Sequence, residues 1–476
     1  MTLACNYIRS CWQSPNGGEE VAIRNPANAR EIVFKTVYAD VDLARQAINS
    51  ASAAWPLWKR TALAERVRLV EEFLTSLERD RDKIAEIITL ENGKLFPEAK
   101  AEISASLGEG RYQLKFLAEN LAEFINGQEI RYEPLGATLL ITPWNFPVAT
   151  ILRKLIPAIL TGNTALVKAS EFTPYTSMRL FLLLAEAGFP DGVVNLVVGP
   201  GDELVPAILK SNLVSAVSFT GSVKNGQEIA RQIDPVATKY QAELGGNNTL
   251  IVLRDADISQ AAQAAVSNGF ACCGQWCTGT GRIIVEKSVY DRFIELLPEK
   301  VLKIKLGEGF DEEATMGPLI NQTQLQRVQE AVSQAVAEGG SVLTGGNKAP
   351  QPELSAGCFF QPTILTNITP RMSIADQEIF GPVLVVLKVA DADEALEILN
   401  NSNYGLSFSV YTRNEKLAEK FISEANCGLC HVNLPTAYRD VALPLLGWQD
   451  SGIGMPESGR FMRDFFTRTK AIYRGN

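Results

Sequence analysis

Two stretches of this chain alternate short β-rich runs with helical runs, and this alternation constrains the fold more than any other feature. Between residues 137 and 253, the runs ATLLIT, TALVKA, VVNLVVG and AVSFTG are separated by helical patterns such as TSMRLFLLLAEAGF and DELVPAILKSN. A second alternation follows residue 258 and includes GRIIVEK, PVLVVLKV and SFSVYT. Strands that alternate with helices form parallel sheets with helical crossovers. Because 476 residues are too many for one ordinary core, the sequence predicts two α/β domains.

The preceding region follows a helical period instead. Between residues 41 and 125, apolar side chains recur at i, i+3 and i+4, for example in AERVRLVEEFLTSLERDRDKIAEIITLENGK. We expect amphipathic helices there.

The composition of the chain limits the cell compartment and the binding partners that we expect for it. A net charge of −9 argues against a nucleic-acid surface. The chain has no apolar run near the ~18 residues of a membrane span, and its N-terminus has no secretory signal pattern. We therefore expect a cytoplasmic protein with no nucleic-acid or membrane partner, whose eight cysteines are reduced thiols.

Three of these cysteines lie in ACCGQWC, residues 271–277. A four-thiolate zinc site would need Cys273 and Cys277 to meet Cys427 and Cys430, without the compact spacing of such sites. CGLCH at 427–431 matches the pattern of c-type haem attachment, but it also reads as a buried strand in which cysteine packs as a small apolar side chain. We predict no metal site.

A reactive thiol is the remaining interpretation. Cys277 stands between the bulky Trp276 and the flexible run TGTG. The thiolate form of cysteine is a strong nucleophile. Because His431 is the single histidine, a base for this thiol is more readily a carboxylate. On spacing alone, a purely structural cysteine stays open.

FTGSVKNG, residues 219–226, resembles a strand-to-helix turn whose N–H groups bind an anion, with Gly221 allowing the tight turn. An ordinary βα turn fits the same residues, and a GxGxxG dinucleotide fingerprint is absent.

Taken together, six motifs resemble the aldehyde dehydrogenase superfamily, from about residue 20 to the C-terminus, in that family's order and spacing. They are ITPWNFP (141–147), VKASEFTP (167–174), FTGS (219–222), ELGGNN (243–248), GQWCTGTGR (274–282) and EIFGPV (378–383).

The resemblance implies three catalytic residues. Cys277 matches the nucleophile, Glu243 the general base, and Asn145 a donor to the oxyanion. A thiolate adds to an aldehyde, the thiohemiacetal loses hydride, and a carboxylate activates the water that hydrolyses the thioester. On spacing alone, Glu243 and Asn145 read as capping or turn residues. Because relatives that transfer the acyl group to coenzyme A tend to lack this glutamate, we expect the free acid as product.

The resemblance also implies a dinucleotide on a Rossmann-like sheet without the usual fingerprint. Lys168 and Glu171 match residues that hold the adenosine ribose, and Glu378 matches one that holds the nicotinamide ribose. Glu171 would repel a 2′-phosphate, which favours NAD, whereas Lys168 and Lys224 would tolerate NADP. The other expected cofactor contacts are Gly221 and Ser222 at the pyrophosphate, Phe380 near the nicotinamide, and Thr142, Pro143, Trp144 and Leu244.

The substrate is less constrained. CHVNLPTA, residues 430–437, looks like the stretch seen in α-ketoglutaric semialdehyde dehydrogenases. A semialdehyde carries a distal carboxylate, for which Arg153 and Arg439 are candidate partners. Trp276 stands where such relatives often have arginine, and Trp276 and Phe146 would suit an apolar or aromatic aldehyde instead. Both substrate classes stay open, as do an acylating reaction and a non-catalytic relative.

The expected organisation has three parts. They are a dinucleotide-binding domain (1–117 and 137–245), a catalytic domain with the nucleophile (246–446), and a small β oligomerisation element (118–136 and 459–476). MPESGRFMRDFFTRTKAIY keeps the pattern by which relatives pair, so we expect a homodimer or homotetramer.

One segment departs from the family pattern. The family commonly shows PFGGxKxSGxG near the substrate mouth and subunit contact, and this chain reads PLLGWQDSGIG, with Leu445, Leu446 and Gln449 as the replacements.

Overall fold

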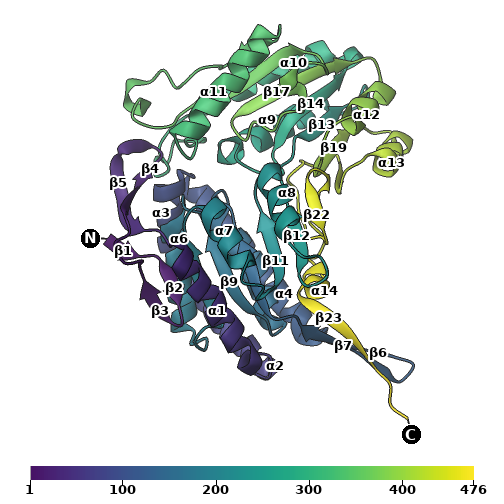
Figure 1. Cartoon of the computed structure of the whole chain (residues 1–476). Helices are drawn as coiled ribbons and strands as arrows, with labels where there is room; N and C mark the ends of the chain where they lie inside the picture. The colour runs from purple at the N-terminus through teal and green to yellow at the C-terminus, as the bar shows by residue number, and fades with distance from the viewer. Residues whose placement is uncertain (1, 476) are drawn as a thin grey trace.

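An eight-stranded sheet organises the first lobe of the computed structural model, which describes residues 2–475 (Figure 1). Five parallel strands form its centre, in the order β12, β11, β8, β9, β10, and antiparallel pairs extend it at both edges. Its strands are β2 (Asn6–Ile8), β3 (Cys11–Gln13), β8 (Ala137–Ile141), β9 (Thr164–Ala169), β10 (Val194–Val198), β11 (Val214–Thr220), β12 (Lys239–Glu243) and β22 (Gly452–Gly454).

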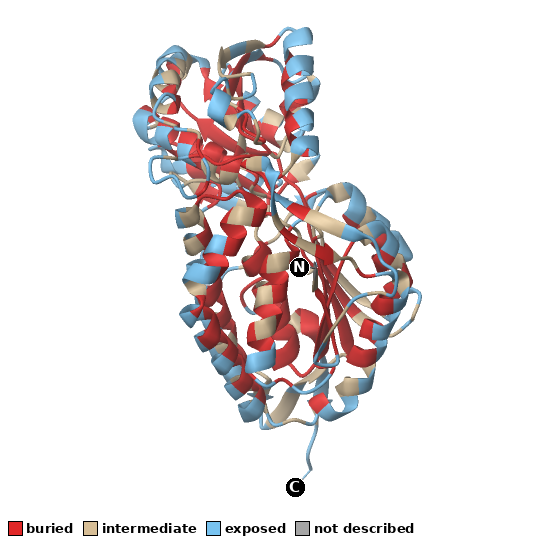
Figure 2. Cartoon of the chain, turned by 90° about the vertical axis from the view of Figure 1, so that its left-hand side faces the viewer, coloured by how far each residue is buried: buried red, intermediate tan, exposed pale blue. Residues whose placement is uncertain are grey.

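Helices cover both faces of this sheet, because successive strand residues point to opposite faces. Leu139 and Ile141 pack with α1, α7 and α8, whereas Leu140 packs with the helices of the other face. The first group is α1 (Val41–Trp58), α7 (Gly201–Leu209) and α8 (Val223–Gln232); the second is α2 (Leu63–Arg79), α3 (Arg81–Asn92), α4 (Phe96–Glu119), α5 (Pro147–Leu160), α6 (Pro174–Glu186) and α14 (Phe461–Phe466). Figure 2 shows the strands buried between exposed outer helix faces.

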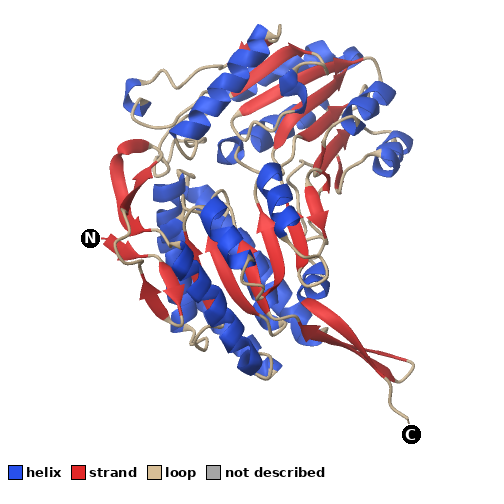
Figure 3. Cartoon of the chain, in the orientation of Figure 1, coloured by secondary structure: helices blue, strands red, loops and turns tan. Residues whose placement is uncertain are grey.

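A seven-stranded sheet organises the second lobe, and only its β15–β16 pair is antiparallel among the described residues. The strands are β13 (Asn248–Val252), β14 (Thr280–Glu286), β15 (Ser341–Thr344), β16 (Thr363–Ile368), β17 (Val383–Val389), β19 (Ser407–Tyr411) and β20 (Leu429–Val432). The helices are α9 (Ile258–Phe270), α10 (Lys287–Val301), α11 (Gln322–Ala337), α12 (Ala392–Asn400) and α13 (Glu415–Glu424). The two predicted strand–helix alternations are therefore present (Figure 3).

Smaller elements complete the chain. Strands β6 (Ala122–Ile125), β7 (Gln128–Pro134) and β23 (Thr467–Ile472) form an antiparallel sheet that projects from the first lobe toward the C-terminus (Figure 1). The prediction of helix as far as residue 125 was wrong at its end, because α4 ends at Glu119 and residues 122–125 pair with β7. The domain boundaries stay a prediction. The remaining elements are β1 (Thr2–Ala4), β4 (Glu20–Asn25), β5 (Asn28–Val37), β18 (Tyr404–Gly405), β21 (Trp448–Gln449) and the 3-10 turns Ala271–Gly274, Pro352–Leu354 and Ser373–Asp376.

The strand order explains where a ligand can bind. The chain runs from β8 through β9 to β10 and then returns to place β11 on the other side of β8. Open α/β sheets bind ligands outside the carboxyl ends of the strands at such a reversal. Strand β12 ends at Glu243, and β13 of the second sheet begins at Asn248, so the two lobes join beside this edge. Among residues 2–475, no helix combines the length and the apolar character needed to cross a bilayer.

Candidate active site

A cavity of about 700 Å³ lies between the two lobes. It collects most of the residues predicted from the motifs, although they come from distant parts of the chain. The predicted residues that line it are Pro143, Trp144, Asn145, Phe146, Arg153, Gly221, Ser222, Glu243, Leu244, Trp276, Cys277, Glu378, Phe380 and Arg439. Thr142, Lys168 and Glu171 lie outside its lining.

Glu243 is the last residue of β12, and its side chain is 6% exposed. Burial, with a smaller effect from the nearby Glu457 carboxylate, raises the pKa of Glu243 to about 8, although Lys154 and Arg153 act in the opposite direction. The carboxyl group of glutamate normally loses its proton near pH 4, so the Glu243 carboxylate is a much stronger base than usual. The environment suits a group that accepts a proton near neutral pH.

Cys277 lies in the loop between α9 and β14. The Asn248 side chain donates from Nδ2 to the carbonyls of Cys277 (2.7 Å) and Gly279 (2.8 Å), which holds the loop in place. Burial raises the pKa of Cys277 to about 11, and the Glu243 charge adds to the rise, whereas Arg153 and Arg439 lower it. The thiol is therefore protonated at neutral pH, and a neighbouring base is needed to form the thiolate.

The other two cysteines of the cluster take part in the turn. Cys272 and Cys273 have φ of 50° and 57°, in the left-handed region that non-glycine residues rarely adopt. The Cys272 N–H donates to Glu98 Oε1 at 2.8 Å, and Cys273 is buried in the core of the second lobe. This turn carries the chain from the end of α9 to Cys277. All eight cysteines have free thiols in the part of the chain that is described.

Asn145 is oriented by a buried ion pair that the sequence motifs do not contain. The side-chain Nδ2 of Asn145 donates to the Gln275 backbone carbonyl at 3.0 Å. The backbone carbonyl of Asn145 accepts from Lys94 Nζ at 2.8 Å. Lys94 also pairs with Glu102 at 2.6 Å, and both side chains are 1% exposed. Glu102 in turn accepts from the Val148 N–H at the start of α5, at 2.9 Å. Asn145 also lines the cavity, and within residues 2–475 its Nδ2 donates to no acceptor other than the Gln275 carbonyl.

The backbone N–H of Cys277 is a second donor at this point. It donates to no acceptor within residues 2–475. An amide side chain and an unpaired backbone N–H beside a nucleophile are the usual components of an oxyanion hole.

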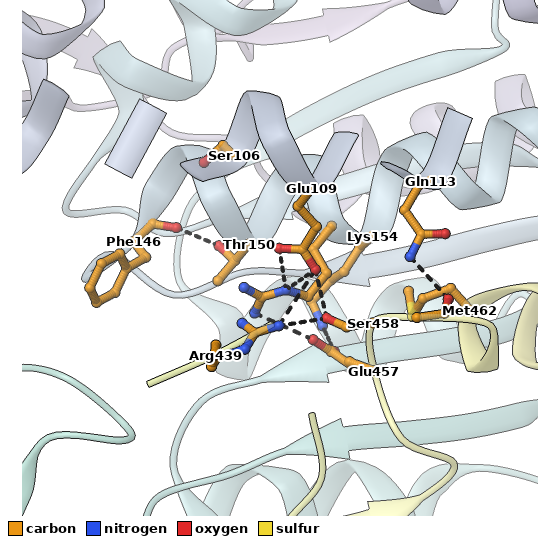
Figure 4. Close-up of polar contacts among 12 residues, drawn as sticks. Ser106, Glu109, Gln113, Phe146, Thr150, Lys154, Arg439, Glu457, Ser458 and Met462 are labelled. Carbon is orange, nitrogen blue, oxygen red and sulfur yellow. Dashed lines mark hydrogen bonds and ion pairs between the residues drawn. The ribbon is translucent and has the colours of Figure 1, made fainter. Parts of the chain in front are cut away.

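Arg153 and Arg439 lie together and share one carboxylate. Arg153 Nε donates to both oxygens of Glu109, at 3.0 and 3.2 Å. Arg439 Nη2 donates to Ser458 Oγ at 2.8 Å and lies 3.7 Å from Glu109 Oε1. Ser458 donates to Glu109 Oε1 at 2.6 Å, and Figure 4 shows Glu109, Arg439 and Ser458 directed toward one another.

A second carboxylate extends this cluster. Glu457 pairs with Lys154, and its other oxygen lies 3.8 Å from Arg153 Nη1. Three basic side chains therefore meet two carboxylates, Glu109 and Glu457, in this cluster. Of these five residues, Arg153, Arg439 and Glu109 line the cavity.

Trp276 and Phe146 form an aromatic part of the wall. Their ring centroids lie 5.3 Å apart, at an interplanar angle of 49°. The Lys94 ammonium lies 3.9 Å from the centroid of Phe146, so the ring packs between a buried cation and Trp276.

The predicted adenosine-ribose residues, Lys168 and Glu171, lie at the carboxyl end of β9, beside the predicted cofactor contact Thr142 at the end of β8. Lys168 Nζ is 3.3 Å from Glu171 Oε2, and the Thr142 N–H donates to the Lys168 carbonyl at 3.1 Å. The Thr142 hydroxyl is buried and makes no hydrogen bond within the described chain.

The helix that follows β11 begins at a predicted pyrophosphate contact. Ser222 caps α8 by accepting from the Asn225 N–H at 3.4 Å. A side chain on Gly221 would place its Cβ 2.5 Å from the Phe219 ring, so only glycine fits the turn. The start of α8 opens into the cavity, where its free N–H groups favour an anion.

The other predicted cofactor residues lie across the cavity. Glu378 Oε1 accepts from the Gly246 N–H at 3.0 Å, and burial raises the pKa of Glu378 to about 7. Phe380 has φ of 52° and packs edge-on against Trp144, with centroids 5.6 Å apart. Gln324, from α11, donates to the carbonyls of Ile379 and Phe380, each at 3.0 Å, and so holds this strained loop.

The single histidine has a structural environment. The two ring nitrogens of His431 lie 3.0 Å from the Phe408 carbonyl and 2.9 Å from the Tyr438 carbonyl. It does not line the cavity. Cys427 is buried in the second lobe, and Cys430 is exposed on β20. Within residues 2–475, no three His, Cys, Asp or Glu side chains are grouped as metal ligands.

Comparison with known proteins identifies the family. Residues 12–472 match the profile of the Aldehyde dehydrogenase family. The chain is 34% identical over 474 residues to the α-ketoglutaric semialdehyde dehydrogenase of Bacillus subtilis (strain 168), an alignment that covers 98% of this chain and 97% of that protein. The chain belongs to the aldehyde dehydrogenase family. It is an oxidoreductase that acts on aldehydes.

Solved structures resemble this aldehyde dehydrogenase over nearly its whole length. Betaine aldehyde dehydrogenase from Staphylococcus aureus, in complex with NAD⁺, has a TM-score of 0.94 at 31% identity, covering 98% of this chain and 94% of that chain. The structure of 3,6-anhydro-L-galactose dehydrogenase in complex with NADP has a TM-score of 0.95 at 32% identity and covers 100% of both chains. The predicted family and α/β fold class are confirmed.

Several site residues of this aldehyde dehydrogenase are absent from the motifs. Glu109, Ser458 and Glu457 hold the two arginines, Lys94 holds Asn145, and Gln324 holds the Phe380 loop. Lys94 ends the run ENGK between two helices and reads there as a helix stop. Leu445, one of the departures from the family pattern, lines the cavity and pairs through its backbone with Glu457.

Proposed function

We propose that this chain oxidises an aldehyde to the free carboxylic acid through Cys277, with NAD as the hydride acceptor. The observation that carries the proposal is the convergence of Cys277, Glu243 and Asn145 on one cavity, from three separate parts of the chain. We further propose that the substrate is a semialdehyde whose distal carboxylate is bound by Arg153 and Arg439.

The first step uses the two raised pKa values. The pKa of Glu243 is raised to about 8 and that of Cys277 to about 11, so the carboxylate takes the thiol proton at a modest free-energy cost. The Cys277 sulfur then adds to the aldehyde carbon. The Asn145 amide and the Cys277 N–H donate to the oxygen as its charge develops. When bound, NAD accepts the hydride that leaves the adduct, and a thioester remains on Cys277.

The second step releases the acid. Glu243 first releases the thiol proton to solvent and then accepts a proton from water; the resulting hydroxide adds to the thioester carbonyl, and the Cys277 sulfur departs as a thiolate. A positioned base contributes about 10²–10⁴ to such a rate. This role for Glu243 supports hydrolysis rather than acyl transfer to coenzyme A.

The residues present fit a dinucleotide. The Lys168–Glu171 pair would hold the adenosine ribose, and the start of α8 at Ser222 would hold the pyrophosphate. Glu378 would hold the nicotinamide ribose. Glu171 supports NAD, because its charge would oppose a 2′-phosphate. NADP is the alternative, and one structural neighbour was solved with it.

An apolar or aromatic aldehyde is the second candidate substrate, because Trp276 and Phe146 form one wall. A semialdehyde needs Arg153 and Arg439 to bind its distal carboxylate, whereas an apolar or aromatic aldehyde does not. The two guanidinium groups of Arg153 and Arg439, which line the cavity and share the one carboxylate of Glu109, support a carboxylate-bearing substrate, as do the names of several relatives, including the α-ketoglutaric semialdehyde dehydrogenase above.

A rate comparison tests the proposal. We expect Cys277→Ala to abolish aldehyde oxidation and to keep NAD binding, measured by fluorescence titration. Glu243→Gln should release a burst of about one equivalent of reduced cofactor per subunit and then stall, because the thioester persists. Wild-type steady turnover in either variant would contradict the proposal. Aldehydes with and without a terminal carboxylate, each assayed with NAD and NADP and with and without coenzyme A, decide substrate, cofactor and reaction type.

We also propose that the β6–β7–β23 sheet joins subunits into a homodimer or homotetramer, and that the protein is cytoplasmic. The projecting sheet exposes large apolar side chains, with Phe124 74% and Ile125 54% exposed. Exposed apolar side chains on a projecting element are typical of an interface. Light scattering of Phe124→Ser should show a smaller assembly than the wild type. An unchanged mass would contradict the interface.

A further inference from the structure

Arg282 is a buried cation that the proposed chemistry does not use. It lies in β14, the strand that follows the Cys277 loop, and it is 3% exposed and outside the lining of the active-site cavity. Burial lowers the pKa of Arg282, and the Asp376 carboxylate, 3.5 Å from Nη1, acts in the opposite direction. A buried guanidinium is costly unless its donors are paired and its charge is compensated. The partners of Arg282 therefore indicate which segments it holds.

The guanidinium joins two segments of the second lobe. Its Nε donates to Thr249 Oγ1 at 2.9 Å, across the β13–β14 pairing in which Thr249 lies opposite Arg282. Its Nη1 donates to the Ala375 carbonyl at 3.0 Å, in the 3-10 turn Ser373–Asp376. Asn247 Nδ2 donates to the same carbonyl at 3.2 Å. Because a carbonyl oxygen has two lone pairs, the Ala375 carbonyl is held from β14 and from the segment before β13.

The end of this turn is held from a third segment. Asp376 Oδ2 accepts from the Asn403 N–H at 2.9 Å and from Asn403 Nδ2 at 3.1 Å, and Ser402 Oγ donates to Asp376 Oδ1. Beyond the turn, Glu378 Oε1 accepts from the Gly246 N–H at 3.0 Å. The position of Glu378 therefore depends on the hydrogen bonds that fix the turn before it.

The nucleophile belongs to the same arrangement. Asn248, which adjoins Thr249, donates from Nδ2 to the Cys277 carbonyl at 2.7 Å. Because β14 pairs with β17, the Cys277 loop and the Glu378 loop precede neighbouring strands. Arg282 ties the first of these loops to the turn that begins the second. Groups that react must be held in close alignment, and a displacement of about 1 Å slows a reaction about 100-fold.

We propose that Arg282 is a positioning residue, which fixes the loop 375–380 against the loop 275–279 and so sets where the nicotinamide half of the dinucleotide binds relative to the thiol. This inference rests on the proposed function. The adenosine half has its expected site in the first lobe, at Lys168 and Glu171, which Arg282 does not contact. Loss of Arg282 should therefore affect the two halves of the dinucleotide unequally.

Fluorescence titration of the full chain with NAD and with AMP, which carries only the adenosine half, tests the inference. Arg282→Met removes two hydrogen bonds and should weaken NAD binding about tenfold or more, whereas AMP binding should change less than about twofold. Arg282→Lys keeps the charge beside Asp376 but not the planar fork, so it should recover part of the NAD affinity. Arg254→Met is the matched control, because Arg254 pairs with Glu286 at an exposed position after β13, and it should bind both ligands as the wild type does.

The first turnover gives a second readout. At saturating NAD, Arg282→Met should form reduced cofactor about tenfold more slowly than the wild type, because the loop 375–380 no longer has a fixed position. The KM for NAD should rise, and the KM for the aldehyde should change less than about twofold, since Arg282 does not line the cavity. A general loss of structure would change both KM values.

Asp376→Asn covers the case in which Arg282→Met fails to fold. The Asp376 side chain is 27% exposed, and asparagine keeps its volume while it removes the charge that faces Arg282. We expect NAD binding about two- to fivefold weaker and AMP binding unchanged. Equal losses of NAD and AMP affinity in the folded variants, or unchanged NAD affinity in both, would overturn this inference while the wild type still oxidises aldehydes. A wild type that neither binds NAD nor oxidises an aldehyde would refute the proposed function as well.

Discussion

Glu243→Gln should stabilise the folded protein at alkaline pH. The Glu243 carboxyl is buried, forms no side-chain hydrogen bond within residues 2–475, and has its pKa raised from 4.5 to about 8. Folding therefore favours the protonated form. The stabilisation due to this preference is fully present below pH 4.5 and is lost as the pH rises through about 8. Glutamine has nearly the same shape and never ionises, so the variant avoids that loss.

The magnitude follows from the two pKa values. A difference of about 3.5 in pKa corresponds to a loss of about 5 kcal/mol of stability, at about 1.36 kcal/mol for each pH unit, and this loss is complete by about pH 9. At pH 7 the loss of stability is about 3 kcal/mol, since this pH lies only about 2.5 above the pKa of Glu243 in the unfolded chain. A proposed catalytic carboxylate with this cost would be a case in which function is maintained against stability.

Urea unfolding at 25 °C, followed by tryptophan fluorescence at pH 5, 7 and 9, measures the effect. Because the chain has two lobes, transition midpoints are compared rather than a single free energy of unfolding. We expect nearly equal midpoints at pH 5 and a midpoint on the order of 1 M higher for Glu243→Gln at pH 9. Glu203→Gln, at an exposed position on α7, is the matched control and should follow the wild type. A midpoint difference that stays constant with pH, or that favours the wild type at pH 9, would refute the reasoning.

Three further outcomes are expected. The rate of Cys277 alkylation by iodoacetamide, followed by mass spectrometry, should rise with pH toward about 11 in the wild type. Glu243→Gln should shift this rise to lower pH, because the neighbouring negative charge is gone. Superimposable pH profiles of the two proteins would be inconsistent with this coupling. Gln324→Met removes two hydrogen bonds to the Phe380 loop and should weaken NAD binding about tenfold in a fluorescence titration, and unchanged affinity would exclude the positioning role. Arg439→Met should raise KM about tenfold for a carboxylate-bearing aldehyde but less than about twofold for an uncharged aldehyde of equal length; equal effects on both would contradict carboxylate recognition.

The sequence by itself determined the parts of this protein whose signals are local. Buried parallel strands read as apolar runs such as TALVKA, since both faces of the sheet are covered. Motifs in register predicted Cys277, Glu243 and Asn145 as site residues before any fold was known, and these three residues line one cavity. The helical prediction failed only at its end, where residues 122–125 pair with a strand.

Only the tertiary structure decided which side chains position these residues and how far their surroundings shift their pKa values. Ser458 contacts Glu109 across 349 residues of sequence, and no local pattern marks either side chain. The rise in the pKa of Glu243 comes mainly from burial, which depends on segments far along the chain. Periodicity and motifs report on neighbours in sequence, whereas desolvation and ion pairing depend on neighbours in space. That physical difference separates what could be predicted here from what could not.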